Sequence, residues 1–293
     1  MDGLHICSPA KINLFLEVIA RRPDGYHEIE TAMQVVDLCD RVYLSRIPRG
    51  IEINVSGEEV PTGQDNLAYR AAALLAESAG LRGGVRIGLE KRIPVSGGLG
   101  GGSSNAAAVL AGLNRLYGLL YPREALQNLA ARLGSDVPFF LSDGLTLATG
   151  RGEVLMPISA SWSREWVVIA NPRVPVSTAW VYREASSKLT EWGPRASIKP
   201  LIATGALAWP PTWAFNRLEA VVLPHRPEVR ALKDLLEAGG GRPALMSGSG
   251  GSVFAVVPDA ATGEALVARV RAGGGFATLV TTLPNNPILT ATE

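Results

Sequence analysis

The feature that most constrains this chain is the stretch from Pro94 to Leu110, which opens with glycines and closes with the spacing of a helix. Before it, the apolar residues of 85–89 alternate as in a strand. After it, apolar residues recur at helical spacing, at Ala106, Val109, Leu110, Leu113 and Leu116. Glycines let backbone N–H groups approach an anion, and the free N–H groups and dipole of a helix start favour negative charge. The order strand, glycine loop, helix therefore predicts a place to hold phosphate.

Two better-known glycine motifs do not fit this loop. A Walker A loop needs Lys-Ser/Thr directly after its last glycine, but Ser103 and Ser104 follow Gly102 with no lysine. The dinucleotide fingerprint fails because the sixth position counted from Gly98 is Ser103. A flexible turn without a ligand is the remaining alternative, and it is disfavoured because such linkers rarely stand directly between a strand and an apolar helix.

Composition limits the class of protein. The 293 residues predict two lobes that share an interface. The 28 basic and 27 acidic residues give a net charge of +1 without a long basic run, which argues against a nucleic-acid surface and leaves small anionic ligands open. Cys7 and Cys39 are too few for a zinc cluster or a disulfide framework, and we interpret them as packed thiols in a reducing cytoplasm. No export signal or apolar span is recognisable, so we expect a cytoplasmic protein that contacts neither membrane nor nucleic acid.

The glycine stretch closely resembles the second motif of the GHMP small-molecule kinases. Residues 93–110 most resemble the branch that phosphorylates 4-diphosphocytidyl-2-C-methyl-D-erythritol. The resemblance implies that ATP is bound by Pro94, Val95, Ser96, Gly97, Gly98, Leu99, Gly100, Gly101, Gly102, Ser103 and Ser104. It implies a weaker role near the adenine for Asn66 and Lys91. From the residues alone, Asn66 is an N-cap for an alanine-rich, largely buried helix over 68–79.

Lys11 and Asn13 lie on one face of an alternating segment, 8–18, that predicts a half-buried strand. Composition alone favours a solvated lysine here. However, the segment resembles the first motif of the GHMP kinases, which implies that Lys11 reaches the active site and that Asn13 contacts substrate.

Asp136 lies in the segment Gly134-Ser135-Asp136-Val137-Pro138-Phe139. An aspartate two residues before proline could cap a short helix. The segment also resembles the one that supplies the catalytic aspartate of the GHMP kinases. That resemblance implies that Asp136 accepts the proton of the substrate hydroxyl, while Lys11 favours the ionised carboxylate and stabilises charge on the transferred group.

Tyr26 and His27 follow the turn Arg22-Pro23-Asp24-Gly25. An aromatic side chain there could simply cover a sheet edge. The segment is similar to the cytidine-recognition segment of the kinase branch named above, and ring stacking with a histidine hydrogen bond suits a nucleobase. Thr178 and Tyr182 lie in a second segment similar to a substrate segment of that branch; Tyr182 would enclose cytosine with Tyr26, and core packing is its alternative role.

The last third of the chain carries a further glycine motif. Residues 245–252 resemble the third GHMP motif, in which Gly248 and Gly250 would present backbone donors to the substrate phosphate. Arg217 stands where the GHMP kinases usually have an aspartate, so no role is assigned to it. The region 172–211 is expected to be loop-rich, and residues 284–293 look like a tail.

The resemblance covers nearly the whole chain, and it implies an α+β fold of two lobes. We expect a ribosomal-protein S5-like N-terminal lobe over 1–160, which binds ATP and carries catalysis, and a ferredoxin-like substrate-binding lobe over 161–293. The expected reaction is ATP- and Mg²⁺-dependent phosphorylation of the 2-hydroxyl of the cytidine-linked substrate, in isoprenoid precursor synthesis. The alternatives are a GHMP kinase for mevalonate, homoserine or a sugar, and a nucleotide-binding protein without turnover. The sequence assigns neither Mg²⁺ ligands nor an oligomeric state.

Overall fold

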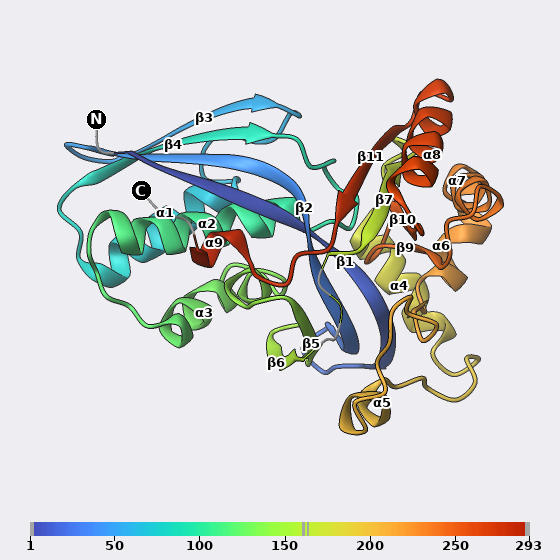
Figure 1. The fold of residues 1–293 in the computed structure, drawn as a ribbon. Coiled ribbons are helices and arrows are strands. Elements are labelled where there is room, and N and C mark those ends of the chain that lie inside the picture. Colours follow the sequence, from blue (N-terminus) through green and yellow to red (C-terminus); the bar gives the residue numbers. More distant parts are fainter. Residues whose placement is uncertain (1–2, 160–161, 163, 291–293) are drawn as a thin grey trace.

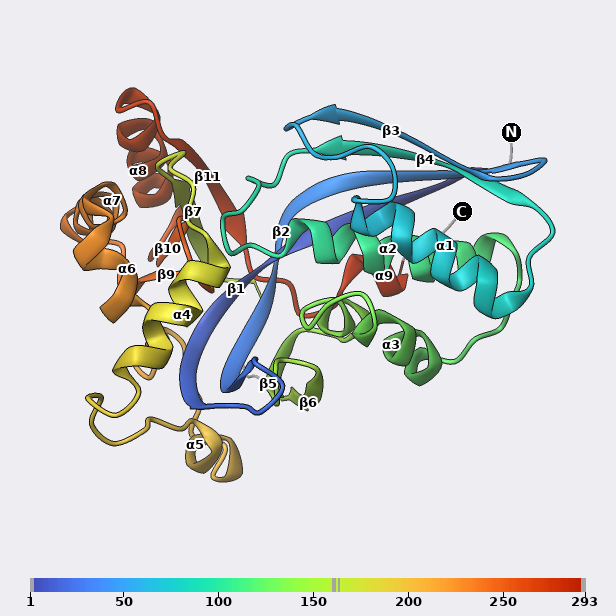
Figure 2. The same cartoon turned by 180° about the vertical axis from the view of Figure 1, so that it is seen from behind.

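The structure is a computed structural model that describes all residues except 1–2, 160–161, 163 and 291–293. Its strands form two sheets, one of seven strands and one of four, each with its own helices (Figures 1 and 2). The predicted α+β organisation in two lobes is confirmed.

The larger sheet forms the N-terminal lobe, with the order β3-β4-β2-β1-β8 and a β5–β6 hairpin attached to β2. Its strands are β1 (Gly3–Arg21), β2 (His27–Ile47), β3 (Ile51–Gly57), β4 (Gly84–Lys91), β5 (Leu145–Thr149), β6 (Val154–Ile158) and β8 (Phe215–Asn216). The helices that lie against one face of this sheet (Figure 1) are α1 (Leu67–Ala79), α2 (Gly101–Leu116), α3 (Arg123–Ala131), the 3₁₀ turn η1 (Pro138–Leu141) and α9 (Pro287–Thr290). The apolar residues that α2 buries against β1 and β2 hold the glycine loop at the end of the sheet.

The smaller sheet forms the C-terminal lobe and is antiparallel, in the order β11-β7-β10-β9. Its strands are β7 (Trp166–Asn171), β9 (Ala244–Met246), β10 (Val253–Val256) and β11 (Phe276–Thr281). The helices of this lobe are α4 (Thr178–Lys188), α5 (Lys199–Ala203), α6 (Glu219–His225), α7 (Pro227–Ala238) and α8 (Ala260–Ala272). The expectation that 172–211 is loop-rich was therefore wrong for α4 and α5.

β1 is buried on both faces, so the prediction of a half-buried strand was wrong. Ile12 and Leu14 belong to a cluster that includes Ile169 of β7 and Phe254 of β10. The opposite face, which carries Lys11, is also shielded from solvent. The alternation in the sequence was real, but the second lobe covers the face that a single lobe would leave exposed.

Three further expectations were wrong. Residues 284–290 are not a loose tail, because Ile288 is buried and Asn286 donates hydrogen bonds to the carbonyl oxygens of Phe140 (2.8 Å) and Ser142 (3.1 Å). Helix α1 buries only one face. The two cysteines are not packed thiols, since one is exposed and the other half-buried.

The chain returns to the N-terminal lobe after it has entered the C-terminal one. β8 pairs in parallel with β1 through Phe15 and Phe215, and α9 contacts both β1 and η1. The predicted boundary between 160 and 161 falls outside the described residues. A division of the chain at one position therefore stays a prediction.

Candidate active site

A buried carboxylate fixes both ends of the glycine loop. Asp40 accepts backbone hydrogen bonds through Oδ1, from Arg92 N (2.7 Å) and Ile93 N (2.9 Å). Its Oδ2 pairs with Lys91 Nζ and accepts from Asn105 Nδ2 (2.9 Å) in α2. The end of β4 and the first turns of α2 are thus tied to one point on β2. The sequence analysis did not identify Asp40.

The peptide groups of the glycine loop have a common orientation. Three consecutive carbonyl oxygens accept hydrogen bonds from outside the loop: Gly97 from Ser252 N (3.2 Å), Gly98 from Ser247 Oγ (2.9 Å) and Leu99 from Lys11 N (3.0 Å). In a trans peptide the C=O and the following N–H point in opposite directions. The N–H groups of Gly98, Leu99 and Gly100 therefore point away from β1 and from the third motif, as an anion-binding loop requires.

Helix α2 starts without a side-chain cap and without an acidic residue in its first turn. Its N-cap is Gly100, at φ +71°, where a Cβ would come within 2.8 Å of the Phe140 ring. The first N–H groups of a helix have no partner within the helix and favour an anion. A cavity of about 460 Å³, the smaller cavity, opens at this point and is lined by all loop residues from Pro94 to Ser103.

Asn66 and Lys91 also line the smaller cavity, and both side chains already have partners. Asn66 caps α1 as predicted, because its Oδ1 accepts from Ala68 N (2.9 Å) and its Nδ2 donates to Pro61 O (2.7 Å). Lys91 is buried against Asp40. Their place near an adenine stays a prediction.

Lys11 and Asp136 form an ion pair with Nζ and Oδ2 3.6 Å apart. The Lys11 side chain is 4% exposed and that of Asp136 is 39% exposed, so only the carboxylate opens to solvent. Burial lowers the pKa of Lys11, and the charge of Asp136 acts against this shift. Asp136 does not serve as a helix cap: η1 begins after Val137 and has no side-chain cap.

Asn13 orients the Lys11 ammonium. Its Oδ1 accepts from Lys11 Nζ at 2.5 Å, and its Nδ2 donates to Thr31 Oγ1 at 2.8 Å. Ser247 Oγ approaches the same Asn13 oxygen at 3.4 Å, and a Cβ on Gly248 would lie 3.3 Å from Lys11 Nζ. The third motif therefore closes over the ion pair from the C-terminal lobe.

A larger cavity, of about 1000 Å³, is lined by both residues of the ion pair. The predicted site residues that line it are Lys11, Asn13, Tyr26, His27, Gly98, Gly100, Ser103, Asp136, Thr178, Tyr182 and Gly248. Gly98, Gly100, Ser103 and Thr178 line both cavities. Ser104 and Gly250 line neither one: Ser104 is buried against Ser8, and a Cβ on Gly250 would overlap Met246.

Three aromatic side chains, those of Tyr26, His27 and Tyr182, line the larger cavity. The rings of His27 and Tyr182 are 5.1 Å apart, and the His27 Nε2 is 2.6 Å from Ser186 Oγ. Burial, followed by the charge of Arg21, lowers the pKa of His27, which favours the neutral ring at pH 7. Tyr26 is 53% exposed, and the Arg151 guanidinium lies 4.8 Å from its ring centre.

Sequence reasoning missed the basic residues of the larger cavity. Arg21, Arg151 and Arg183 all line it. Arg151 had a weak signal, since it stands alone between Gly150 and Gly152. Arg21 and Arg183 had none, because exposed arginines on a strand end and a helix look like any solvated charge.

Arg217, which received no role, holds a buried partner. It donates to Glu17 through Nε (2.8 Å) and Nη2 (2.6 Å), and Glu17 is fully buried in β1. The Arg217 guanidinium also lies over the rings of Trp192 and Phe215. This residue ties the C-terminal lobe to β1 outside the two cavities.

Comparisons with known proteins agree with this arrangement. The family model described as "GHMP kinases N terminal domain" matches residues 66–144, and "GHMP kinases C terminal" matches 198–275. A 4-diphosphocytidyl-2-C-methyl-D-erythritol kinase of Synechococcus sp. (strain JA-2-3B'a(2-13)) is 46% identical over 88% of this chain and 86% of its own length. The chain belongs to the 4-diphosphocytidyl-2-C-methyl-D-erythritol kinases of the GHMP family. Another relative with that kinase name, from Geobacter sulfurreducens, is 42% identical over 97% of this chain and 100% of its own length.

Solved structures of GHMP kinases share the fold. A crystal structure of 4-(cytidine 5'-diphospho)-2C-methyl-D-erythritol kinase superimposes with a TM-score of 0.80 at 38% identity, covering 95% of this chain and 99% of that one. A mevalonate kinase from Methanococcus jannaschii reaches 0.72 at 14% identity, with 96% and 99% covered, and shows the fold alone. The expected GHMP fold is confirmed.

Two negative findings bear on the site. Among the described residues, no group of three or more His, Cys, Asp or Glu side chains could hold a metal ion. No helix within the described part of the chain is long and apolar enough to cross a membrane.

Proposed function

We propose that this kinase transfers the γ-phosphoryl group of ATP to the 2-hydroxyl of 4-diphosphocytidyl-2-C-methyl-D-erythritol, giving the 2-phosphate and ADP. The observation that carries the proposal is the position of the ion pair of Lys11 and Asp136. Both residues line the larger cavity, as do Tyr26, His27 and Tyr182, and Lys11 lies beside Gly100 of the glycine loop, which lines the larger and the smaller cavity alike. A triphosphate in the smaller cavity and an alcohol in the larger one would meet beside this pair.

Asp136 acts as the general base. Its half-exposed carboxylate can accept the hydroxyl proton while the oxygen attacks the γ-phosphorus and the bond to the bridging oxygen of ADP breaks. Lys11 is held by Asn13 and is buried, so its charge acts strongly on the transferred group. Phosphoryl transfer needs positioning and charge stabilisation above all, and this pair supplies both.

Mg²⁺ enters with ATP as part of the nucleotide substrate. The cation usually keeps several waters and is held by one or two carboxylates together with substrate phosphates. The described residues offer no cage of three acidic or imidazole ligands, which fits an ion held mainly by the triphosphate. The ion would neutralise charge on the phosphates, while the N–H groups of the loop and of α2 bind their oxygens.

The cytidine group binds beside the aromatic side chains that line the larger cavity. Tyr26 offers an exposed ring face, and Tyr182 packs against His27 from the C-terminal lobe. Stacking on aromatic faces and a hydrogen bond to the base edge by a neutral imidazole distinguish cytosine from an alcohol without a base. The cytoplasmic location predicted from the sequence stays a prediction.

The test compares two acceptors. Purified protein is given MgATP and methylerythritol with or without its cytidine diphosphate group, and ADP release is followed. We expect the cytidine-linked acceptor to exceed the other by at least about 100-fold in kcat/KM, since buried polar groups reject analogues that leave them unpaired. Equal turnover would favour a mevalonate, homoserine or sugar kinase, and no ADP release with any acceptor would indicate a nucleotide-binding protein without turnover.

A further inference from the structure

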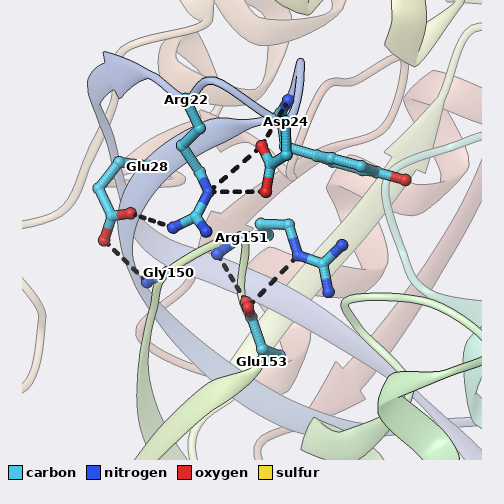
Figure 3. Close-up of polar contacts among 7 residues, drawn as sticks. Arg22, Asp24, Glu28, Gly150, Arg151 and Glu153 are labelled. Carbon is cyan, nitrogen blue, oxygen red and sulfur yellow. Dashed lines mark hydrogen bonds and ion pairs between the residues drawn. The ribbon is translucent and has the colours of Figure 1, made fainter.

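The turn that carries Tyr26 is held by a network of charged side chains (Figure 3). Asp24 accepts from Tyr26 N (3.1 Å) and from Arg22 Nε (3.2 Å). Arg22 in turn donates through Nη1 to Glu28 Oε2 at 2.7 Å. The turn between β1 and β2 is therefore closed on itself through Arg22 and Glu28.

Glu28 also joins this turn to a second one. Its other oxygen, Oε1, accepts from Gly150 N at 3.1 Å, and Ile29 N donates to Gly150 O at 2.8 Å. Gly150 begins the turn between β5 and β6, which we call the Gly-Arg-Gly turn (residues 150–152). Figure 3 shows Glu28 between Arg22 and Gly150, with one oxygen directed to each.

The Gly-Arg-Gly turn lies near both Tyr26 and Asp136, two residues that line the larger cavity. Glu153 holds Arg151, because it accepts a hydrogen bond from Arg151 N (2.6 Å) and lies 3.3 Å from Arg151 Nε. The Arg151 guanidinium lies over the Tyr26 ring. Gly152 follows two residues after Gly150, the residue that donates to Glu28. A Cβ on Gly152 would lie 3.8 Å from Asp136 Oδ1. One short turn thus contacts the base-recognition residue and lies beside the catalytic carboxylate.

We propose that Glu28 is a positioning residue that fixes the distance between the Tyr26 turn and the Gly-Arg-Gly turn, and through it the distance from the cytosine site to Asp136. This inference rests on the proposed function. Glu28 and Arg22 are 37% and 34% exposed, and ion pairs at such exposure contribute little to stability. The network should therefore affect substrate placement much more than folding.

The experiment compares four proteins by steady-state kinetics and thermal denaturation: wild type, Glu28→Ala, Glu28→Gln and Glu52→Gln. Glu28→Gln keeps an oxygen that can accept from Gly150 but loses the charge that binds Arg22. Glu52→Gln is the control, because Glu52 accepts from Arg86 (2.8 Å) in an exposed ion pair on β3 and β4, and neither residue lines the two cavities.

Glu28→Ala should raise the KM for the cytidine-linked acceptor roughly 10-fold and should lower the preference for it over the acceptor without cytidine by a similar factor, because small displacements of substrate-positioning groups weaken productive binding. The KM for ATP and the Tm should stay near wild type. Glu28→Gln should show an intermediate loss, and Glu52→Gln none.

A Glu28→Ala protein with an unchanged acceptor preference would overturn the proposal. Equal losses for both acceptors, or losses that follow the Tm, would also overturn it, because they indicate a purely structural role. If Glu28→Ala does not fold, the same criteria apply to Glu28→Gln. A wild-type protein that does not prefer the cytidine-linked acceptor would instead refute the proposed function, which the wild-type measurement alone decides.

Discussion

Replacing Gly102 by alanine separates the binding role of the glycine loop from its folding role. Gly102 lies in the first turn of α2, where the nearest atom to an added Cβ is Leu67 Cδ1, at 3.8 Å. Both residues line the smaller cavity. The methyl group would therefore meet no protein atom too closely, but it would occupy space at the wall where we place the triphosphate.

The expected effects on stability and on binding have opposite signs. Alanine is a better helix residue than glycine by up to about 1 kcal/mol, which should raise the Tm by about 2 °C. Loss of one hydrogen bond from an N–H group to a charged phosphate costs about 1.5 to 3 kcal/mol. Affinity for ATP should then fall roughly 10- to 150-fold.

Gly100→Ala is the contrasting variant. Gly100 has φ +71°, and its Cβ would come within 2.8 Å of the buried Phe140 ring and 3.2 Å of Lys11 Cγ. A non-glycine residue in such a conformation costs about 1 to 3 kcal/mol before any clash is counted. Gly100→Ala should lose both stability and affinity for ATP. Comparison with Gly102→Ala therefore distinguishes steric exclusion of the ligand from destabilisation of the fold.

Thermal denaturation and calorimetric titration with a non-hydrolysable ATP analogue measure the two effects. If Gly102→Ala binds the analogue as tightly as wild type, the phosphate site does not lie at the start of α2. If its Tm falls as much as that of Gly100→Ala, the argument from free space is wrong.

Three further predictions concern single groups. Asp136→Asn should lower kcat by roughly two to four orders of magnitude with unchanged affinity for the ATP analogue, as expected for a general base; near wild-type turnover would remove that role. Arg217→Met should destabilise the protein by about 3 to 5 kcal/mol in urea denaturation because the Glu17 carboxylate stays buried without a cationic partner, whereas Glu17→Gln combined with Arg217→Met should cost less; equal costs would contradict this account. Because burial holds the pKa of His27 below 6.5, the unfolded chain takes up this proton first as the pH falls. Stability should therefore fall as the pH drops from about 6.5 toward that lowered pKa. The kcat/KM for the cytidine-linked acceptor should fall only around the lowered pKa itself, where the folded protein takes up the proton, and a His27→Gln protein that keeps the same acidic decline in both would refute the assignment.

Helices with strong local signals could be predicted from the sequence. Asn66 caps α1 as predicted, and the helix expected after the glycine loop is α2. The burial of β1 could not be predicted. Periodicity reports how many faces of a strand are apolar, but the burial of both faces of β1 depends on the other lobe, whose Ile169 packs on the Ile12 face and whose Gly248 lies beside Lys11.

The candidate site was predicted where its residues form local motifs and missed where they come together only in the fold. The glycine loop and the turn before Tyr26 carry recognisable strings of residues. Asp40 does not, although it holds both ends of the glycine loop, because its partners lie 51 to 65 positions further along the chain. A single carboxylate on a long strand gives no sign of such partners.

Strand β1 explains how the N-terminal lobe can carry both Lys11 and the turn with Tyr26. Lys11 lies near the middle of β1, and the turn that carries Tyr26 lies just beyond its end. β1 is paired on one edge with β2 and on the other with β8, which comes from the C-terminal half of the chain. Such a strand cannot shift without breaking contacts in both lobes. Lys11 and the turn that carries Tyr26 are therefore held by one rigid element, and in our proposal the adjustable part of the spacing between them is the turn that Glu28 secures.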